Sequence, residues 1–194
     1  MKLNATYTMP FRRRQEGKTN YEKRLAAVKS GIPRLCVRRT NKYITAQLIG
    51  FEPKGDKVLA QASSKQLESF GWVAEKNLPS AYLTGMLLAV KAKAAGQEKA
   101  ILDIGFSTPI HGTRPFAVLK GAVDGGLNIK LDEKAFPKDD RISGKHIEEL
   151  AKSLDEEAFK KKFSTYVKKG INVKELSKVF EEVKQKILKE GEKK

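Results

Sequence analysis

The sequence of 194 residues has few of the side chains that hold metals or form disulfides. It contains a single cysteine, Cys36, and two histidines, His111 and His146. One cysteine cannot form an intrachain disulfide or a paired-cysteine metal site, and this scarcity is typical of proteins in a reducing compartment. We expect Cys36 to be a small buried hydrophobic residue. We also expect a cytoplasmic protein with no metal and no other cofactor.

Long apolar runs are missing too. The longest strongly apolar stretch lies around residues 83–90, which is far short of the ~20 residues that cross a bilayer. The N-terminus lacks the apolar core of a signal peptide. We therefore expect no membrane partner.

Signatures of nucleotide binding are absent as well. The segment LKGAVDGGLNI, residues 119–129, is rich in glycine. It has neither the GxxxxGK[ST] pattern of a phosphate-binding loop nor the GxGxxG pattern of a dinucleotide site. We expect its glycines to end a helix and to allow close packing, and we expect no small-molecule substrate.

Positive charge, in contrast, is abundant and unevenly placed. The net charge is +16 and the sequence pI is near 9.8. Residues 1–50 hold 12 Lys or Arg against 2 Glu, whereas the remaining 144 residues hold 27 against 21 acidic residues. A polyanion is the expected partner of such a chain, and it should bind near the N-terminus.

Two segments concentrate this charge, FRRRQEGKTNY at 11–21 and RLCVRRTNKYITAQ at 34–47. Arginines bind phosphates and stack on bases, and the aromatic side chains Phe11, Tyr21 and Tyr43 can stack in the same way. The combination indicates RNA rather than a small substrate. The plainer alternatives are a solubilising or targeting arm and, for Tyr21, packing of its ring on its own helix.

The N-terminal residues 1–18 show no periodicity, so we expect an extended, mobile arm that folds on its partner. On an extended segment, Arg12, Arg13 and Arg14 would point in alternating directions. Thr19 and Glu22 have the spacing of a capping box, which predicts a short basic helix at 20–30.

The middle of the chain predicts a sheet with helices. Strands are expected at 34–39, 43–49 and 58–62, followed by a helix at 79–95, a buried strand at 100–106 and a helix at 113–125. Asn77 is the candidate cap of the first of these helices. In the first strand, Arg34, Cys36 and Arg38 share the face that should meet solvent or RNA.

The last third of the chain predicts helices near 145–153, 156–169 and 173–190, with a frayed end from residue 189. The predicted fold class is therefore α/β, with a mixed β-sheet flanked by helices, an extended basic N-terminal arm and a helical C-terminal appendage. The predicted division is 1–31 for the arm and short helix, 32–131 for an α/β RNA-binding core, and 132–194 for a linker and helical extension.

An enzymatic function would depend on one acidic residue, Asp103. Asp103 is expected on a buried strand of a mixed sheet, where a two-metal nuclease would need several converging carboxylates. Asp124, or Asp56 before the third strand, could join it, but neither spacing forms a recognised cluster. We therefore expect no enzyme.

Three blocks carry a resemblance to a known family. FRRRQEGKTNY, PRLCVRRTNKYITAQ at 33–47 and LKGAVDGGLNI closely resemble the archaeal form of ribosomal protein L eighteen, akin to the eukaryotic 5S-rRNA-binding protein L five. The resemblance implies a large-subunit component that binds 5S rRNA and helps attach it to the large-subunit rRNA in the central protuberance, beside neighbouring ribosomal proteins. It also implies an α/β core related to the ribonuclease H-like motif and no catalysis. The alternative function is a non-ribosomal RNA chaperone or regulator.

The resemblance also implies which residues bind RNA. The family's N-terminal RNA-contacting block is matched by Arg12, Arg13, Arg14, Lys18, Thr19 and Tyr21, and its hairpin by Arg38, Arg39, Asn41 and Lys42. Gln15 stands where we expect a further arginine. With the aromatic and basic neighbours added, the predicted rRNA-binding set is Phe11, Arg12, Arg13, Arg14, Lys18, Thr19, Tyr21, Arg24, Arg34, Arg38, Arg39, Asn41, Lys42 and Tyr43.

Overall fold

A four-stranded sheet forms the centre of the molecule. The computed structural model describes residues 6–192, so residues 1–5 of the predicted arm lie outside the described residues. The strands run in the order β3-β2-β1-β4, with β4 parallel to β1 and the other pairs antiparallel. Their bounds are β1 Arg34–Arg39, β2 Ile44–Gly50, β3 Lys57–Ser63 and β4 Ile101–Asp103. The predicted mixed sheet is confirmed.

Strand β4 is shorter than the predicted 100–106 and only half-buried. It pairs with the first three residues of β1, where Arg34 lies opposite Ile101 and Cys36 opposite Asp103. Gly105 then takes a φ of +63°, a left-handed conformation that ends an extended strand. The prediction of a longer, buried strand is therefore wrong.

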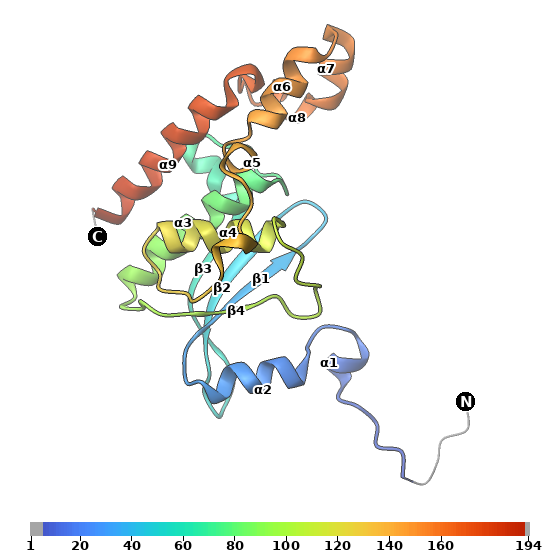
Figure 1. The fold of residues 1–194 in the computed structure, drawn as a ribbon, viewed down its shortest axis with the longest axis vertical. Coiled ribbons are helices and arrows are strands. Elements are labelled where there is room, and N and C mark those ends of the chain that lie inside the picture. The colour runs from blue at the N-terminus through green and yellow to red at the C-terminus, as the bar shows by residue number, and fades with distance from the viewer. Residues whose placement is uncertain (1–5, 193–194) are drawn as a thin grey trace.

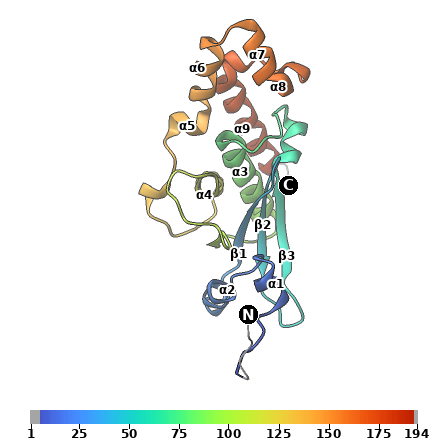
Figure 2. The same ribbon diagram turned by 90° about the vertical axis from the view of Figure 1, so that its right-hand side faces the viewer.

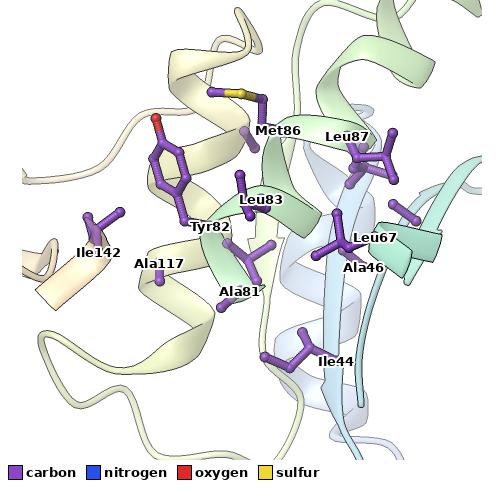
Figure 3. Close-up of a cluster of buried hydrophobic side chains, with 14 of the residues drawn as sticks. Ile44, Ala46, Leu67, Ala81, Tyr82, Leu83, Met86, Leu87, Ala117 and Ile142 are labelled. Atoms are coloured by element: carbon purple, nitrogen blue, oxygen red, sulfur yellow. The ribbon is translucent and has the colours of Figure 1, made fainter. Parts of the chain in front are cut away.

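Two helices cover one face of the sheet (Figure 1). They are α3, Leu78–Ala94, and α4, Arg114–Asp124. Asn77 accepts a hydrogen bond from the Ser80 N–H, 2.8 Å, as expected of the predicted cap. Figure 3 shows Ile44 and Ala46 of β2 on the side of the sheet that faces Leu83 of α3. Helix α3 is buried over most of its length because the sheet, α4 and a later helix all pack against it.

Glycines allow α3 and α4 to touch through their backbones. A Cβ atom on Gly85 would lie 1.9 Å from the Val118 carbonyl oxygen, and one on Gly121 would lie 2.0 Å from the Tyr82 carbonyl oxygen. Gly125 is the C-cap of α4. The glycines of LKGAVDGGLNI therefore end a helix and permit close packing, as predicted.

The C-terminal region is helical, and its bounds differ from the predicted ones in places. Its helices are α5 Asp139–Ser143, α6 Lys145–Ser153, α7 Glu156–Lys162, α8 Ser164–Lys168 and α9 Leu176–Glu192. The predicted helix at 156–169 is broken at Phe163, because this residue leaves helical geometry and buries its ring beside Tyr166. Helix α9 continues to Glu192 instead of fraying from residue 189.

The helical region packs back on the core. Phe180 of α9 contacts the rings of Trp72 and Tyr82, with centroids 6.0 and 5.6 Å apart. Figure 2 shows α9 beside α3, with α6, α7 and α8 at the opposite end of the molecule from the N-terminal helices. Sequence patterns missed α5 and two 3₁₀-helices, Ser64–Phe70 and Glu133–Ala135.

Candidate nucleic-acid interface

The arginine triplet lies on a short helix and not on an extended strand. Helix α1 is Arg12–Gln15, and the Arg14 N–H donates to the Phe11 carbonyl, 2.8 Å. Arg12 Nε donates to Glu16 Oε1, 2.8 Å, and Gln15 Nε2 donates to the Pro10 carbonyl, 2.6 Å. The prediction of an extended arm is wrong over this segment. The three arginines fan around one helical turn, about 100° apart, instead of alternating between two sides.

Contacts also fix the arm to the helix that follows, α2, Tyr21–Lys29. Arg13 Nε donates to Thr19 Oγ1, 2.8 Å, and the rings of Phe11 and Tyr21 lie 5.1 Å apart. The N-cap of α2 is Asn20, whose side chain accepts from the Lys23 N–H, 3.1 Å. The predicted capping box on Thr19 is therefore wrong, since the Thr19 hydroxyl serves Arg13.

A chain of ion pairs lies beneath the arm. Arg34 Nη2 donates to Asp56 Oδ2, 2.7 Å, and Arg34 Nη1 donates to Asp103 Oδ2, 3.1 Å. Arg24 Nη2 reaches the other oxygen of Asp56, 2.9 Å. Arg38 Nη1 donates to the Asp103 carbonyl, 2.8 Å, and Arg38 Nη2 lies 3.3 Å from its carboxylate. The two aspartates thus align three arginines from α2 and β1.

The first strand differs from its predicted pattern. The face bearing Arg34 and Cys36 was expected to meet solvent or RNA, but both residues are buried, and only 5% of the Arg34 side chain is exposed. Arg38, farther along the same face, is exposed. The difference arises because Asp56 and Asp103 come from outside the strand and enclose the Arg34 guanidinium.

Burial and the neighbouring charges shift the pKa values of Asp103 and Cys36 in opposite directions. Burial alone would raise the pKa of Asp103, but Arg38, the Gly105 N–H, the Cys36 thiol and Arg34 outweigh it and hold that pKa below its ordinary value. Burial and the neighbouring carboxylate raise the pKa of Cys36 to about 12. The thiol therefore stays protonated and donates to Asp103 Oδ2, 3.3 Å.

The carboxylates considered for a nuclease do not converge. Asp56 and Asp103 share the Arg34 guanidinium, which leaves a cation where a metal ion would have to bind. Asp124 lies elsewhere and accepts a hydrogen bond from the Tyr82 hydroxyl, 2.6 Å. Among residues 6–192, no group of three or more His, Cys, Asp or Glu side chains is placed to hold a metal ion.

The arm, α2 and the sheet enclose a basic hollow of about 270 Å³. Its basic lining residues are Arg13, Lys18, Arg24, Arg34 and Arg38, together with the acidic Asp56 and Asp103. Thr19 also lines it. The structure thus brings the first predicted block and the start of the second to one place.

Arg39 and Gln47 of the second block also line hollows beside the arm, whereas the turn of this block lies at the other end of β1 from Arg34. A turn links β1 to β2, where the Thr40 N–H donates to the Tyr43 carbonyl, 2.9 Å, and Thr40 Oγ1 accepts from the Tyr43 N–H, 2.9 Å. Arg39, Asn41 and Lys42 are exposed at this turn, and Tyr43 is half-buried.

Sequence reasoning missed the role of the two aspartates that organise the arginines. Asp56 and Asp103 are the only aspartates in the first 110 residues. Isolated acids in a strongly basic region are candidates for structural ion pairs, and this signal could have identified them. It also missed Phe106, which follows β4 and lines the surface beside the arm.

Comparison with known proteins adds a family. The sequence matches the family described as "Ribosomal large subunit proteins 60S L5, and 50S L18" over residues 5–98 and 90–132. It is 48% identical over 189 residues to the large ribosomal subunit protein uL18 of Korarchaeum cryptofilum (strain OPF8), covering 96% of this chain and 97% of that protein. In the part of the chain that the structure describes, no helix has the length and apolar character needed to cross a membrane.

Proposed function

Because the chain belongs to the family of large ribosomal subunit proteins 60S L5 and 50S L18, we propose that it binds 5S rRNA and helps to attach it to the large-subunit rRNA in the central protuberance. Family membership makes the chain a protein of the large ribosomal subunit and not an enzyme. The observation that carries the finer proposal is the basic hollow between arm and sheet, where two aspartates hold several arginines in fixed positions.

The proposed rRNA-binding residues fall into two neighbouring groups. The arm and α2 supply arginines, a lysine and two aromatic rings, and β1 with its turn supplies the remainder. The full set is Phe11, Arg12, Arg13, Arg14, Lys18, Thr19, Tyr21, Arg24, Arg34, Arg38, Arg39, Asn41, Lys42 and Tyr43.

The two groups support different roles. The fan of Arg12, Arg13 and Arg14 can meet phosphates on more than one side of an RNA groove or junction, since guanidinium groups bind phosphate oxygens in pairs. The exposed Arg38 is held against Asp103 before RNA arrives, and the buried Arg34 fixes that aspartate in turn. Preorganised side chains lose less conformational entropy on binding. RNA shape and unpaired bases would then supply specificity.

The proposal extends to the rest of the chain. We propose that residues 132–194 form an extension that meets neighbouring ribosomal proteins, that residues 32–131 form the RNA-binding core, and that residues 1–31 act as its arm. We also propose that the core is a version of the ribonuclease H-like motif. The mixed sheet with α3 and α4 on one face supports that assignment.

A salt titration of binding to purified 5S rRNA tests this function, with a transfer RNA of similar size as competitor. If roughly six to ten phosphates are neutralised, affinity should fall by about 10³ to 10⁵ between low and moderate salt, by analogy with DNA. A strong preference for 5S rRNA at physiological salt would support the ribosomal role. Equal binding to both RNAs, together with annealing activity on unrelated strands, would instead favour the RNA chaperone alternative.

A further inference from the structure

Residues 103–107 form a tight turn directly after β4. The Asp103 carboxylate accepts from the Gly105 N–H, 2.8 Å, and the Ser107 N–H donates to the Ile104 carbonyl, 3.3 Å. Gly105 has a φ of +63°, a conformation that glycine adopts without steric cost. Gly105 and Phe106 are the two central residues of the turn that this last hydrogen bond closes.

The turn is tied to the sheet from a second direction. Arg38 Nη1 donates to the Asp103 carbonyl, 2.8 Å, and its guanidinium carbon lies 3.3 Å from the position that a Cβ on Gly105 would take. Arg38 therefore lies against the turn and leaves it little freedom. The side chain of Phe106 extends from a backbone that β1 and β4 both hold.

Phe106 leaves 49% of its surface exposed. Single exposed apolar residues are common and by themselves mean little. What distinguishes Phe106 is its position between two hollows. One, of about 60 Å³, also includes Arg14, Tyr21 and the acidic Glu22. The other, of about 370 Å³, also includes Arg13 and Ser107.

The larger hollow is strongly basic. Arg13, Lys18, Arg38 and Arg39 line it, and its described lining residues include no carboxylate. Two of these cations have carboxylate partners outside the lining, Lys18 with Glu16 at 2.7 Å and Arg38 with Asp103 at 3.3 Å. The volume of the hollow falls within the range of clefts that hold small organic groups. It combines one flat apolar surface with several cations, and a nucleotide presents the complement of both, a flat base and an anionic phosphate.

We propose that Phe106 is a base-stacking residue, with an unpaired base of the bound RNA lying on its ring and the adjoining phosphates on the cations of the larger hollow. The proposal rests on the proposed RNA-binding function and adds a residue from outside both arginine-rich blocks. Stacking on aromatic rings tolerates any base but requires that the base be unpaired. Phe106 would therefore select a loop, bulge or junction over regular duplex.

Substitution of the ring separates stacking from phosphate contact. Phe106→Ala should weaken binding to purified 5S rRNA by roughly tenfold or more and leave the salt dependence unchanged, because stacking neutralises no phosphate. Phe106→Trp should keep the affinity within about twofold of wild type, since the indole stacks as well as phenyl does. The matched control is Phe51→Ala. Phe51 is 55% exposed in the connection between β2 and β3 and lies outside both hollows, so this change should have little effect.

Fluorescence gives a direct readout of the same contact. The native Trp72 is 1% exposed and provides a constant background in wild type and variant. In Phe106→Trp, addition of 5S rRNA should quench the emission of the introduced indole well beyond the change seen in wild type. A duplex RNA without unpaired bases should quench it much less.

Several results would overturn the proposal. One is wild-type affinity in Phe106→Ala, and another is an affinity loss matched by a lower salt slope, which would indicate a phosphate contact. Unquenched emission from Phe106→Trp in the RNA complex would refute stacking even if the alanine variant were unstable. Quenching by an acidic protein segment but not by RNA would assign the hollow to a protein partner. Failure of the wild type itself to bind 5S rRNA would instead refute the proposed function.

Discussion

The two basic ends of the molecule are built differently. Residues 1–39 contain seven arginines, whereas residues 132–194 contain sixteen lysines and one arginine. At the N-terminal end, Arg34 is almost fully enclosed by two aspartates. In the C-terminal region, Lys169 pairs with Glu68 of the 3₁₀-helix Ser64–Phe70, and the two side chains are 35% and 44% exposed. Arginine forms fixed, forked pairs, while lysine remains hydrated on a flexible stem.

The comparison shows that a count of charges does not identify a nucleic-acid surface. The C-terminal region has more cations than the arm, but 14 acidic residues accompany them between 132 and 194. Beside the arm, Asp56 and Asp103 bind Arg24, Arg34 and Arg38, and within it Glu16 binds Arg12 and Lys18. The arrangement of the arginines, more than their number, marks the N-terminal end as the candidate RNA-binding surface.

The largest expected effect concerns folding stability. Asp103→Ala leaves the enclosed Arg34 with one carboxylate fewer, and loss of a buried partner typically costs about 3 to 5 kcal/mol. Glu68→Ala, which removes the exposed partner of Lys169, should cost less than about 1 kcal/mol. Urea unfolding of both variants measures the difference. Similar losses of unfolding free energy in the two variants would mean that the two ion pairs contribute equally to folding stability.

How much of this network was predictable differs from element to element. The alternation in β1 and the apolar spacing in α3 predicted both elements, because their patterns are local and long. Helix α1 was not predicted, because a single helical turn is too short to show an apolar period in the sequence. It is stabilised by the hydrogen bond from Arg12 to Glu16. The sequence marks Asp103 as a candidate for an ion pair, but it does not identify Arg34 as the partner, because 69 residues separate the two.

In the candidate site, too, residues close in sequence were predicted and residues brought together by the fold were not. The resemblance supplied the basic residues of the arm and hairpin, which are consecutive in sequence. Phe106 belongs to neither block, and it approaches the arm only because β4 pairs with the start of β1. Residues that fold topology brings together leave little signal in a single sequence.

A second, smaller effect concerns RNA affinity. Replacing Arg12, Arg13 and Arg14 together by Ala should weaken binding to 5S rRNA by roughly 30- to 100-fold and lower the salt slope by about two to three. The matched variant replaces Lys160, Lys161 and Lys162 of α7, which are exposed, and should change affinity by no more than about threefold. Salt titrations of both triple variants make the test. Equal losses would show that charge alone governs binding at either end.

The smallest effect is a difference in acid titration. Burial raises the pKa of Glu75 despite a hydrogen bond from Tyr166 and the charge of Lys169, whereas the pKa of Asp103 is lowered. A raised carboxyl pKa means that ionised Glu75 opposes folding at pH 7, and this cost disappears as the pH falls through the folded pKa. The stabilisation from Asp103 is present above the ordinary aspartate pKa and is lost only as the pH falls through its lowered folded value.

Glu75→Gln should therefore raise Tm by a few degrees or less at pH 7. The gain should vanish below about pH 4, where wild-type Glu75 is itself protonated. Thermal melts across that range provide the measurement, with Asp103→Asn as the variant of opposite sign at pH 7. A gain that persists into acid would show that the charge of Glu75 is not its cause.

The parallel pairing of β1 with β4 also has a consequence for biosynthesis. During translation the arginines of the arm leave the ribosomal tunnel long before Asp103 does, because synthesis proceeds from the N-terminus. Until then Arg34 lacks one of its two carboxylates and the Phe106 turn does not exist. A nascent chain can thus attract RNA by charge well before it can hold that RNA in the finished hollow. The Arg34 and Asp103 pair and the Phe106 turn can form only once residues 101–107 have left the tunnel, after about half of the chain has been synthesised.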